Sequence, residues 1–191
     1  MNAGWEAGRY TGATMVSFWK RLFGKRSAAD SKGRGSTVYL SLRAQALGTK
    51  AEEVGVKKGG VEAPFGLVTD WGTEAGLCTI VCFSTGDASI YTESGGGVIG
   101  GIGHERVRQA AAEALATAFG CKSQLQRAHE HPVPRRGIMR FALLTTSGTF
   151  AASAGVTELS QQRHALTPLG NAVQKLIYLL RQSAGPEPRA R

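Results

Sequence analysis

A glycine-rich stretch, Ser94–Gly103, contains the residues whose types and spacing could do chemistry. Gly95, Gly97 and Gly100 satisfy the pattern G-x-G-x-x-G behind an expected strand. Glycines let backbone amides converge on an anion, and the N-terminus of a following helix adds a favourable dipole. The candidate anion-binding residues are Ser94, Gly95, Gly96, Gly97, Gly100, Gly101, Gly103 and His104, with Arg135 and Arg136 as counter-charges.

Three interpretations of this stretch stay open. It is a structural crossover whose glycines let the backbone pack on a sheet, a general phosphate or carboxylate site, or a nucleotide-binding loop. The last is weakened because the expected helix begins about four residues after Gly100 and no strand ending in a carboxylate follows about 20 residues later. The structural crossover is favoured.

The histidines have functional and structural interpretations. His104 beside Glu105 could form an acid/base pair, but adjacent helical residues do not share a face, so we expect a helix cap. His129 and His131 have a spacing that suits zinc on a strand. Here they lie in a proline-flanked loop, which favours a solvated loop without metal.

The serines and cysteines do not form a nucleophilic site. No serine lies in a G-x-S-x-G context, and Cys121 has no partner in the pattern. Cys78 and Cys82 lie four residues apart on an expected strand, so their Cα atoms are about 13 Å apart, too far for a disulfide. The sequence predicts no catalytic residue, no metal ligand and no cofactor.

Basic charge is concentrated at the ends of the chain. The formal net charge is +9. Residues 1–36 carry seven basic and two acidic side chains, whereas residues 37–180 carry 13 basic and 11 acidic ones. A nearly neutral domain with basic extensions argues against a nucleic-acid groove and for a tethered contact with an anionic partner.

Residues 15–26 have the pattern of a short amphipathic helix. Apolar side chains occupy one face and basic ones the rest, which suits an anionic membrane surface or a protein partner. Docking on the protein's own sheet, and a disordered tail, are the alternatives. The candidate contact residues are Trp19, Lys20, Arg21, Leu22, Phe23, Lys25 and Arg26.

Hydrophobic periodicity predicts an α+β fold, with a single antiparallel sheet of about five strands and three helices packed on it. We expect a basic extension over residues 1–36, one domain over 37–182 and a flexible tail over 183–191. The expected strands are Phe65–Asp70, Leu77–Ser84, Ala88–Thr92, Gly137–Thr145 and Thr149–Ala154, and the helices are 37–47, Glu105–Phe119 and one beginning at Thr167.

Two segments, Ile90–Ala111 and Arg163–Arg181, carry a resemblance to a known family. The first contains a strand, a Gly-Gly-Gly-x-x-Gly-Gly loop, His-Glu and a helix, and the second leads from His-x-Leu-x-Pro into the last helix. In these features the chain resembles a family of uncharacterised bacterial proteins over about residues 65–181. The resemblance implies a bacterial origin and one intact domain, and it implies no activity.

We therefore expect a non-enzymatic interaction or regulatory module, recruited through its basic N-terminal segment. Its partner is a protein or an anionic membrane surface, a homodimer stays open, and nucleic acid is not expected. The expected location is the cytoplasm, and a peripheral position at the inner face of the membrane stays open. No run approaches the 18 apolar residues of a membrane span. The alternative is a small enzyme or phospho-ligand-binding protein that uses residues 94–104.

Overall fold

The computed structural model describes residues 32–57 and 59–183, with side chains from Thr37 onward. The helices are α2 (Lys32–Gly48), α3 (Glu105–Gly120), α4 (Val156–Ser160) and α5 (Thr167–Ser183), and the short 3-10 turns are η1 (Ala51–Val54), η2 (Gly101–Gly103) and η3 (Lys122–Gln124). The strands are β1 (Pro64–Thr73), β2 (Gly76–Phe83), β3 (Ala88–Thr92), β4 (Gly97–Ile99), β5 (Gln126–Arg127), β6 (Ile138–Thr145) and β7 (Gly148–Gly155).

The seven strands form one antiparallel sheet in the order β4-β3-β2-β1-β6-β7-β5. The hairpins β1–β2 and β6–β7 meet at the centre, where Val68 pairs with Val81 on one side and with Ala142 on the other. The predicted fold class is confirmed: the protein is α+β, with three longer helices packed on a single antiparallel sheet.

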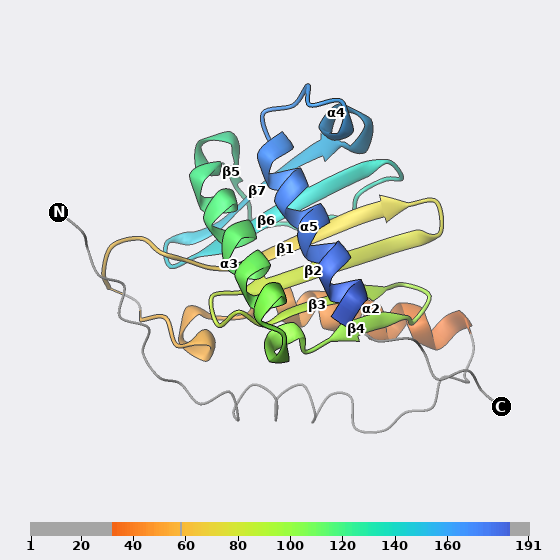
Figure 1. The fold of residues 1–191 in the computed structure, drawn as a ribbon, viewed down its shortest axis with the longest axis horizontal. Coiled ribbons are helices and arrows are strands. Elements are labelled where there is room, and N and C mark those ends of the chain that lie inside the picture. Colours follow the sequence, from red (N-terminus) through yellow and green to blue (C-terminus); the bar gives the residue numbers. More distant parts are fainter. Residues whose placement is uncertain (1–31, 58, 184–191) are drawn as a thin grey trace. The chain divides into compact units, whose positions relative to one another are not determined.

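Helices α3 and α5 lie side by side on one face of the sheet (Figure 1). The predicted apolar stripes of both helices are buried in the core that they form with this face. On α3 the stripe is mostly alanine, and small side chains let a helix approach a sheet closely. The larger residues of α5 supply more of the apolar burial, at about 1.5–3 kcal/mol for each fully buried leucine or isoleucine.

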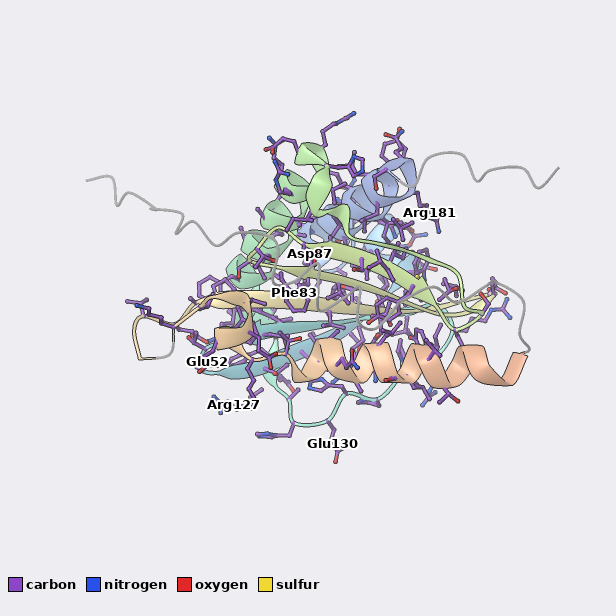
Figure 2. The ribbon with its side chains drawn as sticks, turned by 90° about the horizontal axis from the view of Figure 1, so that it is seen from below. Glu52, Phe83, Asp87, Arg127, Glu130 and Arg181 are labelled. Atoms are coloured by element: carbon purple, nitrogen blue, oxygen red, sulfur yellow. The ribbon has the colours of Figure 1, made fainter. Side chains whose placement is uncertain are left out.

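The opposite face of the sheet carries α2, which lies below the strands in Figure 2 while α3 and α5 lie above them. Four side chains of α2 are buried against the strands: Tyr39, Leu42, Arg43 and Ala46. Ala51 and Val54 of η1 are also buried. Successive side chains of a strand point to opposite faces, so strands covered on both sides become nearly continuous buried runs, as from Phe65 to Asp70.

Some elements differ from the prediction because they are short and held by tertiary contacts. The sheet has seven strands instead of about five, since β4 and β5 form in segments expected to be loops. These strands of three and two residues contain no recognisable alternation, and pairing with a longer neighbour stabilises them. The chain is also helical from Lys32, five residues before the expected start of the domain.

Among the helices that the structure describes, none combines the length and the apolar character that crossing a bilayer requires. Cys78 and Cys82 are free, as their spacing predicted, and both are buried on the same face of β2. Burial raises the pKa of Cys78 to about 11 and that of Cys82 to about 12. Both are therefore protonated and unreactive near neutral pH.

The carboxylate of Glu62 joins the segment before β1 to two other parts of the chain. It accepts hydrogen bonds from Lys122 Nζ at 2.7 Å, from Thr145 Oγ1 at 2.8 Å and from the Ser147 hydroxyl. The bond from Lys122, followed by those from the two hydroxyls, lowers the pKa of Glu62 from 4.5 to about 2. The folded state therefore favours ionised Glu62.

Replacing Glu62 tests this junction through pH. Because the folded pKa lies below the unfolded one, the contribution of Glu62 is present above about pH 5 and is lost as the pH falls toward 2. We expect Glu62→Gln to lower the urea midpoint at pH 7 and the difference from wild type to shrink steadily at lower pH. A difference that stays constant or widens in acid would contradict this assignment.

Candidate functional site

The glycine-rich stretch begins as the turn between β3 and β4. Gly95 has φ +97°, the left-handed region that glycine enters most easily. Its amide donates to the Thr92 carbonyl at 3.0 Å, and the Thr92 amide donates to the Gly96 carbonyl at 2.8 Å. The hydroxyls of Thr92 and Ser94 lie 2.9 Å apart. These polar groups therefore bond to one another inside a hairpin.

Two further glycines are needed for close packing. A Cβ on Gly97 would lie 2.5 Å from the Ile90 carbonyl oxygen on the neighbouring strand. A Cβ on Gly101 would lie 2.6 Å from Val107 and 2.9 Å from Leu180, where η2 packs against both helices of the first face. This geometry supports the structural interpretation of the stretch.

Arg108 connects the end of the glycine-rich stretch to the first turn of α3. His104 precedes the helix with extended backbone angles, and its side chain makes no capping hydrogen bond, contrary to the expected cap. Glu105 instead accepts from Arg108 and, at 2.9 Å, from Gln109. Arg108 also donates to the Ile102 carbonyl at 2.7 Å. Glu105 is therefore bonded to residues of its own helix.

The predicted counter-charges lie apart from the glycines. Arg136 pairs with Glu74 in the turn between β1 and β2, and Arg135 is exposed next to it. Ser94 lies in the turn between β3 and β4, with β2 between these strands and β1. His104 follows the other end of β4. The structure therefore spreads the predicted anion-binding residues over several places and does not bring them into one cluster.

The remaining sequence candidates give no site within the described part of the chain. The predicted membrane or partner contacts, Trp19, Lys20, Arg21, Leu22, Phe23, Lys25 and Arg26, lie outside the described residues. Within residues 32–57 and 59–183, no three histidine, cysteine or acidic side chains gather in a way that could hold a metal ion.

A buried polar cluster that the sequence did not predict lies between α2 and the sheet. Arg43 donates from Nε at 2.9 Å and from Nη2 at 2.7 Å to one carboxylate oxygen of Asp70. The Thr79 hydroxyl donates to the other oxygen at 2.7 Å. Because Thr79 uses its proton there, the Tyr39 hydroxyl, 2.8 Å away, is the donor to Thr79. Arg43 and Asp70 are only 8% and 3% exposed.

The loop of residues 128–136 closes one side of this cluster. Arg43 Nη2 donates to the His131 carbonyl at 2.6 Å, and Arg140 Nη2 donates to the Glu130 carbonyl at 3.1 Å. Arg140 is the cross-strand partner of Asp70, so the two arginines lie on either side of one carboxylate. Among the described residues, no hydrogen-bond partner is present for Arg140 Nε or His131 Nδ1, both of which are buried.

The titratable groups of the cluster are held in neutral or paired states. Burial, followed by Arg140 and Arg43, lowers the pKa of His131, which is therefore neutral at pH 7. Burial raises the pKa of Tyr39 to about 12 and that of Tyr91 further. His131 and the two tyrosines are therefore neutral at pH 7, and the hydrogen bonds of the cluster connect α2 to the sheet.

Two sequence signals could have pointed to the cluster. Asp70 ends an apolar run that was expected to be a strand, and Arg43 lies next to Leu42 on the apolar side of the first helix. A charge in each of two buried surfaces suggests a pair, since a buried charge is rarely left alone. The pairing itself depends on the helix lying over β1, which local pattern does not show.

The chain matches no protein-family model, no curated protein and no solved structure. The family resemblance of residues 65–181 therefore stays a prediction, and the functional argument depends on the geometry.

Substitution of Gly97 tests the structural role of the glycine-rich stretch. Gly97→Ala places a methyl group against the Ile90 carbonyl, so we expect it to lower the free energy of unfolding by about 1–3 kcal/mol in urea titrations. Gly103→Ala is the matched control, because a Cβ there meets nothing within 4 Å. It should change stability by less than about 0.5 kcal/mol. Equal effects of both substitutions would refute the assignment.

A double-mutant cycle tests the buried ion pair. Asp70→Asn leaves the Arg43 charge buried without its partner and should lower the free energy of unfolding by about 3–5 kcal/mol. Arg43→Met should be similarly destabilising, and the double variant should lose much less than the sum. The control is Lys175→Met, which breaks a pair with Glu113 whose side chains are 55% and 50% exposed. Its effect should stay below about 1 kcal/mol.

Proposed function

We propose that this protein is a non-enzymatic interaction and regulatory module whose residues 15–26 bring it to an anionic membrane surface. The observation that carries the proposal is the apolar surface left exposed by α2, the first described helix after that segment. Val38 and Leu40 of α2 are each 48% exposed. These two residues are two positions apart on the helix, so they flank its buried face on opposite sides and each adds exposed apolar surface there.

The same layer of the molecule offers more apolar surface. Val133 is 46% exposed in the loop that accepts a hydrogen bond from α2 at the His131 carbonyl. The opposite side of the domain differs, since the outer positions of α5 are mostly polar, with Tyr178 as the large apolar residue that stays exposed. The α2 layer is therefore the better contact surface.

In the sequence, residues 15–26 are joined to this layer by a short connection. Only residues 27–31 separate the segment from the start of α2. An extended chain spans at most about 3.5 Å per residue, so these five residues reach less than about 20 Å. The segment and the exposed side of α2 can therefore contact one surface together, with basic side chains attracted to anionic lipids.

The other candidate functions have weaker support. A protein partner would need surface complementary to the same basic segment, and a homodimer would need an extended apolar face. The small enzyme or phospho-ligand alternative at Ser94–His104 stays a prediction, but its glycines serve a turn, a strand pair and close helix packing. A membrane surface combines the apolar and basic contacts that the α2 layer and the segment offer.

Co-sedimentation with vesicles tests the proposed function in the full chain. We expect binding to vesicles that contain phosphatidylserine and little binding to pure phosphatidylcholine. Replacing Lys20, Arg21, Lys25 and Arg26 with glutamine removes about 1 kcal/mol of attraction for each residue. Partitioning should fall by about two to three orders of magnitude and should also weaken with salt.

The control removes the same number of charges from the domain. Lys50, Lys57, Arg106 and Arg163 are exposed basic residues, and their joint replacement with glutamine should change partitioning by less than about threefold. Equal losses of vesicle binding in both variants would show that binding depends on net charge alone and would contradict a specific role of residues 15–26. Unchanged binding of the first variant would sink the membrane proposal and leave a protein partner as the alternative.

A further inference from the structure

Two arginines hold the loop of residues 128–136 against the rest of the protein. Arg43 of α2 donates to the His131 carbonyl at 2.6 Å, and Arg140 of β6 donates to the Glu130 carbonyl at 3.1 Å. Most side chains of the loop are exposed. The loop therefore buries little surface of its own, and these two hydrogen bonds connect its middle part to α2 and to the sheet.

The imidazole of His131 lacks a hydrogen bond at one of its ring nitrogens. The side chain is half-buried, and its Nδ1 is buried with no partner among the described residues. In neutral imidazole this nitrogen is either an acceptor without a donor or a donor without an acceptor, whereas in imidazolium both nitrogens carry a proton. Protonation therefore places a charged donor without an acceptor at this position, which is less favourable than the neutral form.

The charged groups around the imidazole also favour its neutral form. Among the described residues, those that act on it are Arg140 of β6, Arg43 of α2 and Asp70 of β1. Both oxygens of Asp70 already accept hydrogen bonds, one from Arg43 and the other from Thr79. Burial, followed by the two arginines, lowers the pKa of His131 from its usual 6.5.

The charged side chains of the loop itself do not compensate an imidazolium. Glu130 and His129 are exposed, and Figure 2 shows the Glu130 side chain at the outer end of the loop, pointing away from the sheet. Arg135 and Arg136 are exposed and add positive charge at the end of the loop. A protonated His131 therefore meets more positive than negative charge, from its own loop as well as from the elements beneath it.

We propose that the loop of residues 128–136 is an acid-sensitive switch, which leaves α2 and the sheet when the His131 imidazole takes up a proton. In the released loop water surrounds the imidazole, and its pKa returns to about 6.5. The bound loop favours neutral His131 and the released loop favours the protonated form, so acid shifts the equilibrium toward release. Release removes the carbonyl acceptors of Arg43 and Arg140 and uncovers the pair between Arg43 and Asp70. The inference goes beyond the proposed function, because the switch needs no membrane.

A nitroxide spin label on the loop tests the switch in the full chain. The label is attached to Val133→Cys in a Cys121→Ser background, and Cys78 and Cys82 stay in place because both are buried. We expect a growing mobile component in the spectrum below about pH 6.5. Its ratio to the restricted component should rise by up to about tenfold for each pH unit, until the pKa of His131 in the bound loop is reached.

Three variants of the labelled protein separate His131 from other acid effects. His131→Gln should remove the pH dependence, because glutamine does not titrate. The matched control, His129→Gln, removes the exposed histidine of the same loop and should keep the full pH dependence. A label moved to Gln174→Cys, an exposed position on α5, should show no change. No rise in mobility between about pH 7.5 and pH 5, an equal rise in His131→Gln, or an equal rise at position 174 would overturn the proposal.

A second measurement on the unlabelled wild-type protein does not depend on the folding of any variant. The ring protons of His131, followed by NMR, should titrate with a midpoint below about 6.5. The midpoint of the mobility change at position 133 should coincide with this midpoint, because one proton controls both events. A mobility change at a different pH, or titration of His131 at or above 6.5, would contradict the switch.

Discussion

The buried pair between Arg43 and Asp70 is the interaction on which the second layer of this protein depends. Both groups leave water, which is unfavourable unless geometry and further hydrogen bonds compensate. Thr79 and the His131 carbonyl supply those bonds, so the pair is saturated. One guanidinium thereby joins α2, β1 and the loop of residues 128–136. Directional bonds of this kind specify one position of the helix over the sheet.

The helices on the two faces of the sheet are consequently positioned by different kinds of interaction. On the face of α3 and α5, apolar side chains fill a continuous core, which is non-directional and tolerates small changes of volume. On the face of α2, apolar side chains such as Leu42, Val68 and Leu144 are also buried, but a polar cluster lies among them and positions the helix. This second face leaves apolar residues of α2 in solvent and leaves β5, β6 and β7 partly open. The apolar residues that we connect with function therefore lie on the face that carries α2.

Packing accounts for the glycine-rich stretch, although its pattern would also suit a ligand. Its glycines permit a left-handed turn at Gly95, contact with a carbonyl at Gly97 and contact with helix side chains at Gly101. A phosphate loop would need the same freedom of the backbone, so the pattern does not distinguish the two. Converging side chains would distinguish them better, and Arg136, one of the predicted counter-charges, pairs with Glu74 instead of with this stretch.

The sequence by itself determined the fold class, the longer strands, the stripes of α3 and α5, and the separation of basic extension from nearly neutral domain. These follow from local periodicity and composition, which depend only on residues that are close together in the sequence. Only the tertiary structure decided the strand order, the short strands β4 and β5, the Arg43–Asp70 pair and the hydrogen bond from Arg43 to the loop of residues 128–136. Each of these features joins residues that are distant along the chain, so its interactions form only after the sheet has brought those residues together.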